Sequence, residues 1–389
     1  MASTTTKPKQ TTTARASDAG FKQPSESEKK ILSITLRGGG LTQPEIAKRT
    51  DLAQQSVSRL VSGLISRGAL YEGERKSEGR RGQPSMAVEI APDYAYTFGV
   101  AIMTDALSVS LLDFSGVVLE QAQSDMPTMT RPAVIETLNK TFAKFIKKRR
   151  LTKNKILGVG VGISGYSLGG HGRYNTPRTL DDWALVDIEE LLRDQLGFPV
   201  WVENDGNAAA IGESLVGAGR TYDNFAYLFF STGIGGGVII NHELMRGCNG
   251  NGGEIGLILP RAVYPHPNLE LLRQIVAQQG IEVTGISDML HKFDPEWPAV
   301  EEWIARTRDS LSLITSALAA ILDPEAIVLG GRIPKSLARK VIPHIEIFDD
   351  ARRAEPRTIP RLMVSETNGD ACAIGAAALP FNKQFFTSV

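Results

Sequence analysis

The chain is poor in cysteine, has no long apolar run and carries no overall excess of charge of one sign. Its two cysteines, Cys248 and Cys372, have no CxxC or CxH neighbour, which excludes a cysteine-rich zinc site and is typical of a reducing compartment. No apolar segment approaches the roughly 18 residues that cross a bilayer, and the first residues lack the apolar core of a secretory signal. We therefore expect a cytoplasmic protein without a membrane partner.

The length excludes a small disulfide-stapled scaffold. At roughly 150 residues per domain, 389 residues allow two or three domains with full cores. Hydrophobic residues make up 42% of the chain and charged residues 22%, which excludes disorder throughout.

The formal net charge of zero conceals an uneven distribution. Residues 1–90 carry 15 Lys or Arg and 9 Asp or Glu, a net charge of +6, so the remaining residues carry a net charge of −6. A basic N-terminal region on an acidic remainder indicates a polyanionic partner for the N-terminal region. A chance excess spread over a solvated surface is the alternative.

The first 92 residues predict a tail followed by three short helices. Residues 1–25 have little apolar content beyond Phe21, so we expect a disordered tail. The first helix follows and stops at the glycines 38–40. Thr42 and Glu45 have capping-box spacing, which predicts a second helix up to residue 49. A third helix, residues 54–67, has one continuous apolar face but only Ala53 where a capping Ser or Thr is expected.

Two short strands, residues 69–71 and 86–90, flank a polar hairpin that is rich in arginine and glycine. Three helices followed by a basic hairpin make a winged helix-turn-helix domain, which we assign to residues 26–92 and call the head. The polar face of its third helix suits the major groove, and the hairpin arginines suit phosphates or a minor groove. A helical module that binds protein is the alternative. The candidate DNA-binding residues are Gln54, Gln55, Ser56, Ser58, Arg59, Arg80, Arg81 and Gln83.

From Tyr96 onward the pattern is that of an α/β protein. Apolar strands are expected at residues 97–102, 107–113, 156–163, 200–203, 226–230 and 326–331, with a third hairpin strand from residue 117 and a helix over residues 132–150. Strands that alternate with helices and end in glycines are typical of nucleotide-binding and sugar-binding α/β folds, whose ligands lie at the strand ends.

Four segments then match the motifs of one family in order and spacing. They are residues 203–210 (ENDGNAAA), 231–237 (STGIGGG), 252–256 (GGEIG) and 323–331 (DPEAIVLGG). Together with the head, they make the chain resemble the ROK family, which joins sugar kinases and sugar-responsive repressors in the actin-like ATPase superfamily. The resemblance runs from about residue 27 to residue 381. It implies that residues 93–389, which we call the body, form a sugar-binding domain of two α/β lobes.

The resemblance also implies a sugar site. Asp205 corresponds to the family's general base, which takes a proton from a sugar hydroxyl, and Asn204 and Asp205 would hold adjacent hydroxyls. Glu254 would accept hydrogen bonds from others, Asn175 resembles a further contact, and Gly165 would form a tight turn that lines the pocket. As alternatives, Asn204 and Asp205 suit the cap of the following helix, and Asn175 suits a turn.

The segment that aligns with the family's ATP-binding motif departs from the family pattern. Kinases of the family begin the domain with Asp-x-Gly-Gly-Thr, whose small residues let backbone N–H groups approach the ATP phosphates. Here bulkier side chains block that approach, and an added carboxylate would repel phosphate, so we predict no enzyme activity and a vestigial base in Asp205. The glycines 235–237 would then be kept for turn geometry. The residues at the four motif positions are Ala101, Met103, Thr104 and Asp105.

The family's zinc motif is absent as well. The resemblance places Leu257 where the family has a zinc-ligating histidine, and residues 258–272 contain no cysteine where the family has three. Because leucine cannot ligate zinc, we expect no metal and no other cofactor. The segment is shortened, so Glu270 aligns with a family glutamate and would be a further sugar contact. The lone His266 between prolines is interpreted as a loop residue.

We therefore predict a sugar-responsive transcriptional repressor. The head would bind operator DNA, the body would bind a sugar or sugar derivative, and the ligand would change the placement of the two heads in a homodimer or tetramer. A bifunctional sugar kinase that uses Asp205 as its base is one alternative, and a ligand-independent DNA-binding factor is the other.

Overall fold

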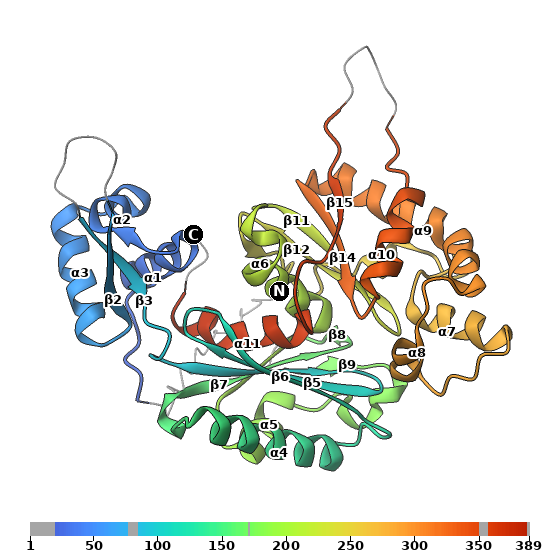
Figure 1. Cartoon of the computed structure of the whole chain (residues 1–389), viewed down its shortest axis with the longest axis horizontal. Helices are drawn as coiled ribbons and strands as arrows, with labels where there is room; N and C mark the ends of the chain where they lie inside the picture. Colours follow the sequence, from blue (N-terminus) through green and yellow to red (C-terminus); the bar gives the residue numbers. More distant parts are fainter. Residues whose placement is uncertain (1–19, 77–84, 170–171, 350–356, 387–389) are drawn as a thin grey trace, which may run out of the picture.

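The computed structural model describes residues 20–76, 85–169, 172–349 and 357–386 (Figure 1). The predicted wing residues Arg80, Arg81 and Gln83 therefore lie outside the described residues, as does most of the predicted tail. No helix within the described ranges is long and apolar enough to cross a membrane.

The head contains the three predicted helices, α1 (Glu26–Gly38), α2 (Gln43–Thr50) and α3 (Gln54–Ser66). They pack on a sheet of strand order β1-β3-β2, formed by β1 (Leu41–Thr42), β2 (Leu70–Lys76) and β3 (Ser85–Ile90). The Glu45 carboxylate accepts hydrogen bonds from the Thr42 backbone N–H at 2.7 Å and from the Thr42 hydroxyl at 2.9 Å, as the capping-box spacing predicted. The expected winged helix-turn-helix arrangement is confirmed.

The segment before α1 differs from the prediction. Phe21, which we assigned to a disordered tail, lies edge-on to Tyr94 at a centroid distance of 5.5 Å and edge-on to Phe385 at 6.1 Å. Aromatic pairs in this geometry stabilise beyond the burial of their area. The predicted tail boundary at residue 25 is therefore wrong for Phe21, because this ring joins the packing between head and body.

The first lobe is a five-stranded sheet of order β10-β7-β4-β5-β6, in which the β4–β5 and β5–β6 pairs are antiparallel and the β4–β7 and β7–β10 pairs are parallel. Helices α4 and α5 cover one face of this sheet, and α11 covers the other (Figure 1). The elements are β4 (Tyr96–Ile102), β5 (Ala106–Asp113), β6 (Val118–Asp125), α4 (Arg131–Arg149), β7 (Ile156–Ile163), α5 (Ile188–Leu196), β10 (Val200–Asn204) and α11 (Ala371–Gln384). A small separate ribbon pairs β8 (Tyr166–Ser167) with β9 (Tyr174–Asn175).

The second lobe is a five-stranded sheet of order β13-β12-β11-β14-β15. Helix α6 packs on its inner face, where it also meets α11, so α6 and α11 form a layer between the two sheets. The other helices of the lobe cover the outer face. The elements are α6 (Asp205–Val216), β11 (Phe225–Phe230), β12 (Ile234–Ile240), β13 (Glu243–Leu244), α7 (Leu269–Gln278), α8 (Ile286–Lys292), α9 (Pro298–Leu322), β14 (Ala326–Gly331), α10 (Lys335–Val341) and β15 (Arg361–Val364).

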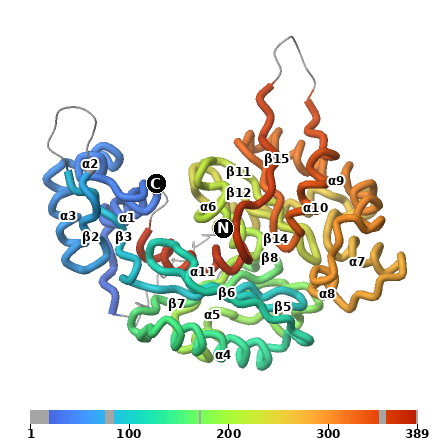
Figure 2. Tube along the Cα trace, in the orientation of Figure 1, coloured from blue at the N-terminus to red at the C-terminus, as the bar shows by residue number. Residues whose placement is uncertain are grey.

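Head and body share one apolar cluster. Buried residues of α1 and α3, such as Ile31 and Val57, belong to the same cluster as Phe114 after β5, Phe381 of α11 and Phe385, which directly follows α11. Figure 2 follows the chain from β15 into α11, which lies between the lobes and the head. Because protein interiors are close-packed, the end of α11 sets the position of the head relative to the lobes.

Candidate functional site

Two of the predicted sugar-site residues lie where β10 ends and α6 begins. The Asn204 side chain caps α6 by accepting a hydrogen bond from the Asn207 N–H at 3.1 Å, and its amide donates to the Gly165 carbonyl at 3.1 Å. The Asp205 carboxylate accepts a hydrogen bond from the Ser164 hydroxyl at 2.7 Å. The capping alternative therefore holds for Asn204, whereas the carboxylate of Asp205 is directed to Ser164.

The turn after β7 brings Gly165 and Asn175 together. Gly165 has a φ of +143°, and a Cβ added there would lie 2.6 Å from the Asn175 carbonyl oxygen, so a side chain does not fit. In the short ribbon, Tyr166 pairs with Asn175, and Asn175 is exposed. The structure thus places Gly165, Asn175 and Asn204 in one neighbourhood.

Glu254 and Asp205 influence each other's protonation. Burial, together with the nearby Asp205 charge, raises the pKa of Glu254 to about 7. Burial also raises the pKa of Asp205, and the hydrogen bond from Ser164 opposes that increase. Among the described residues, neither carboxylate forms an ion pair, and the Glu254 carboxylate has no hydrogen-bond donor. We call Ser164, Asn204, Asp205 and Glu254 the acidic cluster. The Glu254 oxygens can accept hydrogen bonds from hydroxyl groups. Each Asp205 oxygen already accepts one hydrogen bond, from Ser164 or from the Gly206 N–H, and has a further lone pair for a second.

A buried glutamate, Glu203, holds the start of α6 next to the acidic cluster in place through hydrogen bonds. Glu203 accepts hydrogen bonds from the Asn204 backbone N–H at 3.0 Å and from the Asn207 amide at 3.2 Å. Its other oxygen accepts from the Arg246 guanidinium at 2.9 Å. Sequence reasoning missed Ser164 and Arg246. The position of Ser164, directly after a buried strand and before Gly165, was a usable signal, but nothing local in the sequence marks Arg246.

Glu270 is not joined to the acidic cluster by any hydrogen bond or ion pair between described residues. It lies in the first turn of α7, where its carboxylate forms an ion pair with Arg273 at 2.6 Å and accepts a hydrogen bond from Gln274 at 3.1 Å. The Arg273 guanidinium holds the pKa of Glu270 below its usual value. Its role as a sugar contact stays a prediction.

A second set of polar residues connects the two lobes at residues 101–105, the segment that departs from the family's first phosphate motif. Ala101 and Met103 are buried, and the Thr104 hydroxyl lies 2.7 Å from the Thr232 hydroxyl of the second lobe. The Asp105 carboxylate pairs with the Arg332 guanidinium, which follows β14, at 2.6 Å.

The same carboxylate accepts a hydrogen bond from the Ser287 backbone N–H of α8 at 2.7 Å, and Arg332 also donates to the Ser287 hydroxyl at 2.7 Å. We call Thr104, Asp105, Thr232, Ser287 and Arg332 the interlobe bridge. Burial alone would raise the pKa of Asp105, but Arg332 and Ser287 outweigh it, so that this pKa lies below its usual value. No local pattern pointed to Arg332, because it lies 227 positions after Asp105 along the chain.

The glycines 235–237 are retained for a reason other than the predicted turn geometry. They lie within β12, antiparallel to β11. A Cβ at Gly236 would lie 2.4 Å from the Tyr227 carbonyl oxygen, and one at Gly237 would lie 2.6 Å from Ala210 of α6. A Cβ at Gly235 would meet no atom within 4 Å. Close packing of α6 and β11 on β12 therefore requires two of the three glycines.

The segment at the family's zinc position is a 3-10 helix, η4 (Ile255–Ile258), in which the Leu257 side chain is 67% exposed. In the part of the chain that the structure describes, no three His, Cys, Asp or Glu side chains are grouped so that they could hold a metal ion. His266 contacts the Leu259 carbonyl oxygen at 3.2 Å. These residues do not fit the family's zinc site.

The predicted DNA-binding residues of α3 share one face. Gln54, Gln55, Ser58 and Arg59 are exposed and Ser56 is half-buried, whereas the opposite face of the helix is buried in the head. Helix α3 lies on the side of the head that is remote from the body (Figure 1). A polar helix face that is open to solvent in this position has the form needed to enter a major groove.

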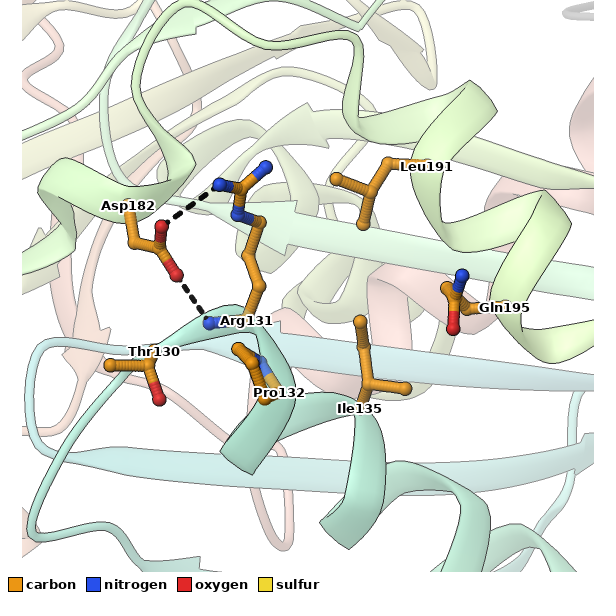
Figure 3. A pocket seen from close by; sticks show the side chains of 7 residues that line it. All are labelled: Thr130, Arg131, Pro132, Ile135, Asp182, Leu191 and Gln195. Carbon is orange, nitrogen blue, oxygen red and sulfur yellow. Dashed lines mark hydrogen bonds and ion pairs between the residues drawn. The ribbon is translucent and has the colours of Figure 1, made fainter.

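A depression of about 640 Å³ on the outer face of the first lobe is separate from these groups. Figure 3 shows it between α4 and α5, with Arg131 donating to Asp182 from its backbone N–H at 2.6 Å and from its guanidinium at 3.0 Å. Its lining contains none of the motif residues. We assign it no role.

Comparison with known proteins gives two family matches. The model of the ROK family matches residues 97–383, and the model of the MarR family matches residues 25–81. An uncharacterized protein of Sinorhizobium fredii, y4fQ, is 27% identical over 93% of this chain and 92% of its own length. The xylose repressor of Bacillus spizizenii is 29% identical over 59% of each chain.

A similar fold is found among solved structures. The crystal structure of a ROK family transcriptional regulator, a homologue of the E. coli MLC protein, superposes with a TM-score of 0.66 at 20% identity. The superposition covers 91% of this chain and 96% of that one. It includes both the head and the body.

Proposed function

This chain belongs to the ROK family, and we propose that it is a transcriptional repressor whose binding to operator DNA is controlled by a sugar or sugar derivative. The observation that carries the proposal is the combination, in one chain, of a DNA-binding head with a body that keeps the acidic cluster. The name of one relative, the xylose repressor, makes a pentose a suitable first candidate for the effector.

The acidic cluster would hold the sugar. Asn204 and Asp205 lie side by side at the start of α6, so they can receive two adjacent hydroxyls, and Glu254 approaches from the second lobe. A carboxylate without a cationic partner gains most from a hydroxyl donor, because a hydrogen bond to a charged group contributes about 1.5–3 kcal/mol. A ligand that bridges the two lobes would favour one interlobe geometry over another.

We further propose that the body is not a kinase and uses no cofactor. The resemblance aligns Met103 and Asp105 with the family's first phosphate loop. The buried Met103 side chain and the Asp105–Arg332 ion pair support the proposal, because neither suits a nucleotide phosphate. Two of the three glycines of the second loop are required by packing. Asp205 then serves as a hydrogen-bond acceptor for the sugar.

Movement of the lobes would reach the head through α11. This helix packs on the sheet of the first lobe and on α6, and its last residues pack in the head's apolar cluster. In a two-fold dimer the two α3 helices would read half-sites separated by whole helical turns of about 10 bp. A sugar that changes the interlobe angle would alter that spacing and release the operator.

The test is selection of operator DNA from fragmented genomic DNA with the full chain, followed by sugar titration of the selected fragment. We expect an imperfect palindrome whose affinity falls as the effector is added. Arg59→Gln on α3 should weaken binding by about 1–3 kcal/mol if Arg59 contacts a base. Failure to enrich any sequence, or an operator affinity that no sugar alters, contradicts the proposal.

A further inference from the structure

A cavity lies where the head meets the body. It has a volume of about 970 Å³ and is lined by α1 of the head, the β5–β6 turn, α6, the 3-10 helix η3 (Ala218–Arg220), the β12–β13 turn and α11. Ligand cavities for small molecules typically measure roughly 300–1,000 Å³. This head–body cavity is therefore large enough for a small molecule that would touch the head and both lobes at once.

Cationic side chains outnumber anionic ones in its lining. Arg37, Arg220, Arg246 and Lys383 face two carboxylates, those of Asp223 and Glu243. Arg246 is already paired with Glu203, which is not part of the lining. Even when the charge of Glu203 is included, the cavity keeps a net positive charge. The cavity therefore favours an anion.

Two of these cations have no acidic partner within the described residues. Arg220 on η3 and Lys383 on α11 are exposed and form no ion pair there, whereas the Asp223 carboxylate lies 2.8 Å from His242. Burial lowers the pKa of Arg37 of α1, and the nearby Asp223 and Glu243 oppose that change. Asp223 thus already has a partner in His242, while Arg220 and Lys383 are available to a ligand.

We propose that the head–body cavity is a second effector site, which takes a phosphorylated small molecule of about the size of a sugar phosphate. Arg220 and Lys383 would bind the phosphate, because guanidinium and ammonium groups form strong charge-assisted hydrogen bonds with phosphate oxygens. The apolar part of the lining, which includes Leu215, Leu379 and Phe386, would cover the rest of the ligand.

This site has a direct route to the acidic cluster. Arg246 lines the cavity and holds Glu203, whose oxygens fix the Asn204 backbone and Asn207 at the start of α6. An anion that attracts Arg246 would loosen that support, so the phosphorylated ligand and the sugar should affect each other's affinity by the same factor. Because the ligand also touches α1, it would bias the position of the head directly.

The experiment measures binding to the full chain by titration calorimetry, with glucose 6-phosphate, glucose and inorganic phosphate as probes. It requires neither the operator nor the natural effector, so its outcome is separate from that of the proposed function. We expect Asp205→Asn to lose binding of the sugar at the acidic cluster but to retain the glucose 6-phosphate binding that depends on Arg220 and Lys383. Arg220→Gln combined with Lys383→Gln should weaken that binding about tenfold or more, since two charge-assisted contacts are lost.

Lys335→Gln combined with Arg339→Gln on the exposed surface of α10 is the matched control and should bind as the wild type does. Binding of inorganic phosphate with the same dependence on Arg220 and Lys383 supports the site and identifies the phosphate as the recognised group. The proposal is overturned if the cavity variant binds glucose 6-phosphate normally, if Asp205→Asn abolishes binding, or if neither phosphorylated probe binds. An unchanged melting temperature of the unliganded variants verifies their folding.

Discussion

The acidic cluster and the interlobe bridge both place carboxylates between the lobes, but in opposite electrostatic states. Asp205 and Glu254 have raised pKa values because they are buried without a cation, whereas the pKa of Asp105 is lowered by Arg332 and Ser287. Burying a charge without a partner costs free energy, and such groups are concentrated at functional sites. The difference supports the proposal that the acidic cluster binds a ligand, whereas the side chains of the bridge satisfy one another.

This contrast distinguishes carboxylates that can bind a ligand from carboxylates that hold the two lobes together. Where the side chains leave hydrogen-bonding capacity unused, an external hydroxyl can be accommodated. Where side chains satisfy one another, as Asp105 and Arg332 do, a ligand would have to break a buried ion pair before it gained any contact. Four tests examine this difference between the acidic cluster and the interlobe bridge.

The largest effect on binding is expected for Asp205→Asn. Loss of the charged acceptor should weaken sugar binding by about 100-fold, because a hydrogen bond to a charged group contributes about 1.5–3 kcal/mol, and operator binding should be unchanged. Titration calorimetry with the effector and an operator-binding assay measure the two. Asp194→Asn on the exposed surface of α5 is the matched control. Loss of both activities would instead assign Asp205 a structural role.

The next largest effect is expected for Asp105→Asn, and it concerns stability. This change leaves the buried Arg332 guanidinium without its counter-ion, so the free energy of unfolding should fall by about 3 kcal/mol. Asp309→Asn removes an exposed pair with Arg308 and should cost less than about 0.5 kcal/mol. Denaturant unfolding measures both changes. Equal effects of the two variants would show that the interlobe bridge contributes little.

A third test uses the titration of Glu254. Sugar hydroxyls require the ionised acceptor, so affinity should increase about tenfold from pH 6 to pH 8, through the pKa of about 7. The pKa of Glu254 in the folded protein lies above its ordinary value of 4.5. The unliganded protein should therefore lose stability as the pH rises from about 4.5 to about 7. Glu254→Gln should remove both dependences. Tighter binding at pH 6 would mean that the protonated acid donates to the sugar.

The smallest effect is expected for Gly235→Ala. The added methyl group meets no neighbouring atom, so stability should change by less than about 0.5 kcal/mol and the response to sugar should persist. Gly236→Ala is the informative counterpart, because its Cβ would overlap the Tyr227 carbonyl oxygen, and it should be severely destabilising. Melting temperatures compare the two. A large loss of sugar response in Gly235→Ala alone would imply that this loop still has a functional role.

Local signals in the sequence predicted much of the fold. The Thr42–Glu45 spacing predicted the start of α2, and the apolar run over residues 156–163 coincides with β7. Asn204 and Asp205 lie at the end of β10 and the start of α6, as the capping alternative expected. These features depend on neighbours in the sequence, which a single chain displays.

Long-range contacts could not be predicted in this way. Arg332 lies 227 positions after its partner Asp105, and Phe21 packs against Phe385 at the other end of the chain. A pair of charges or rings so distant in sequence has no periodicity or spacing that identifies it. The packing role of Gly236 was missed for the same reason, because it depends on the approach of another strand.

The most direct test of the central claim is a thermal-shift measurement on the full chain with a panel of pentoses and hexoses and, separately, with ATP–Mg²⁺. A ligand at 100 times its dissociation constant stabilises by about 2.7 kcal/mol, which raises the melting temperature by several degrees. We predict such a shift for at least one sugar and none for ATP–Mg²⁺. Stabilisation by ATP–Mg²⁺, or no response to any sugar, would contradict the account.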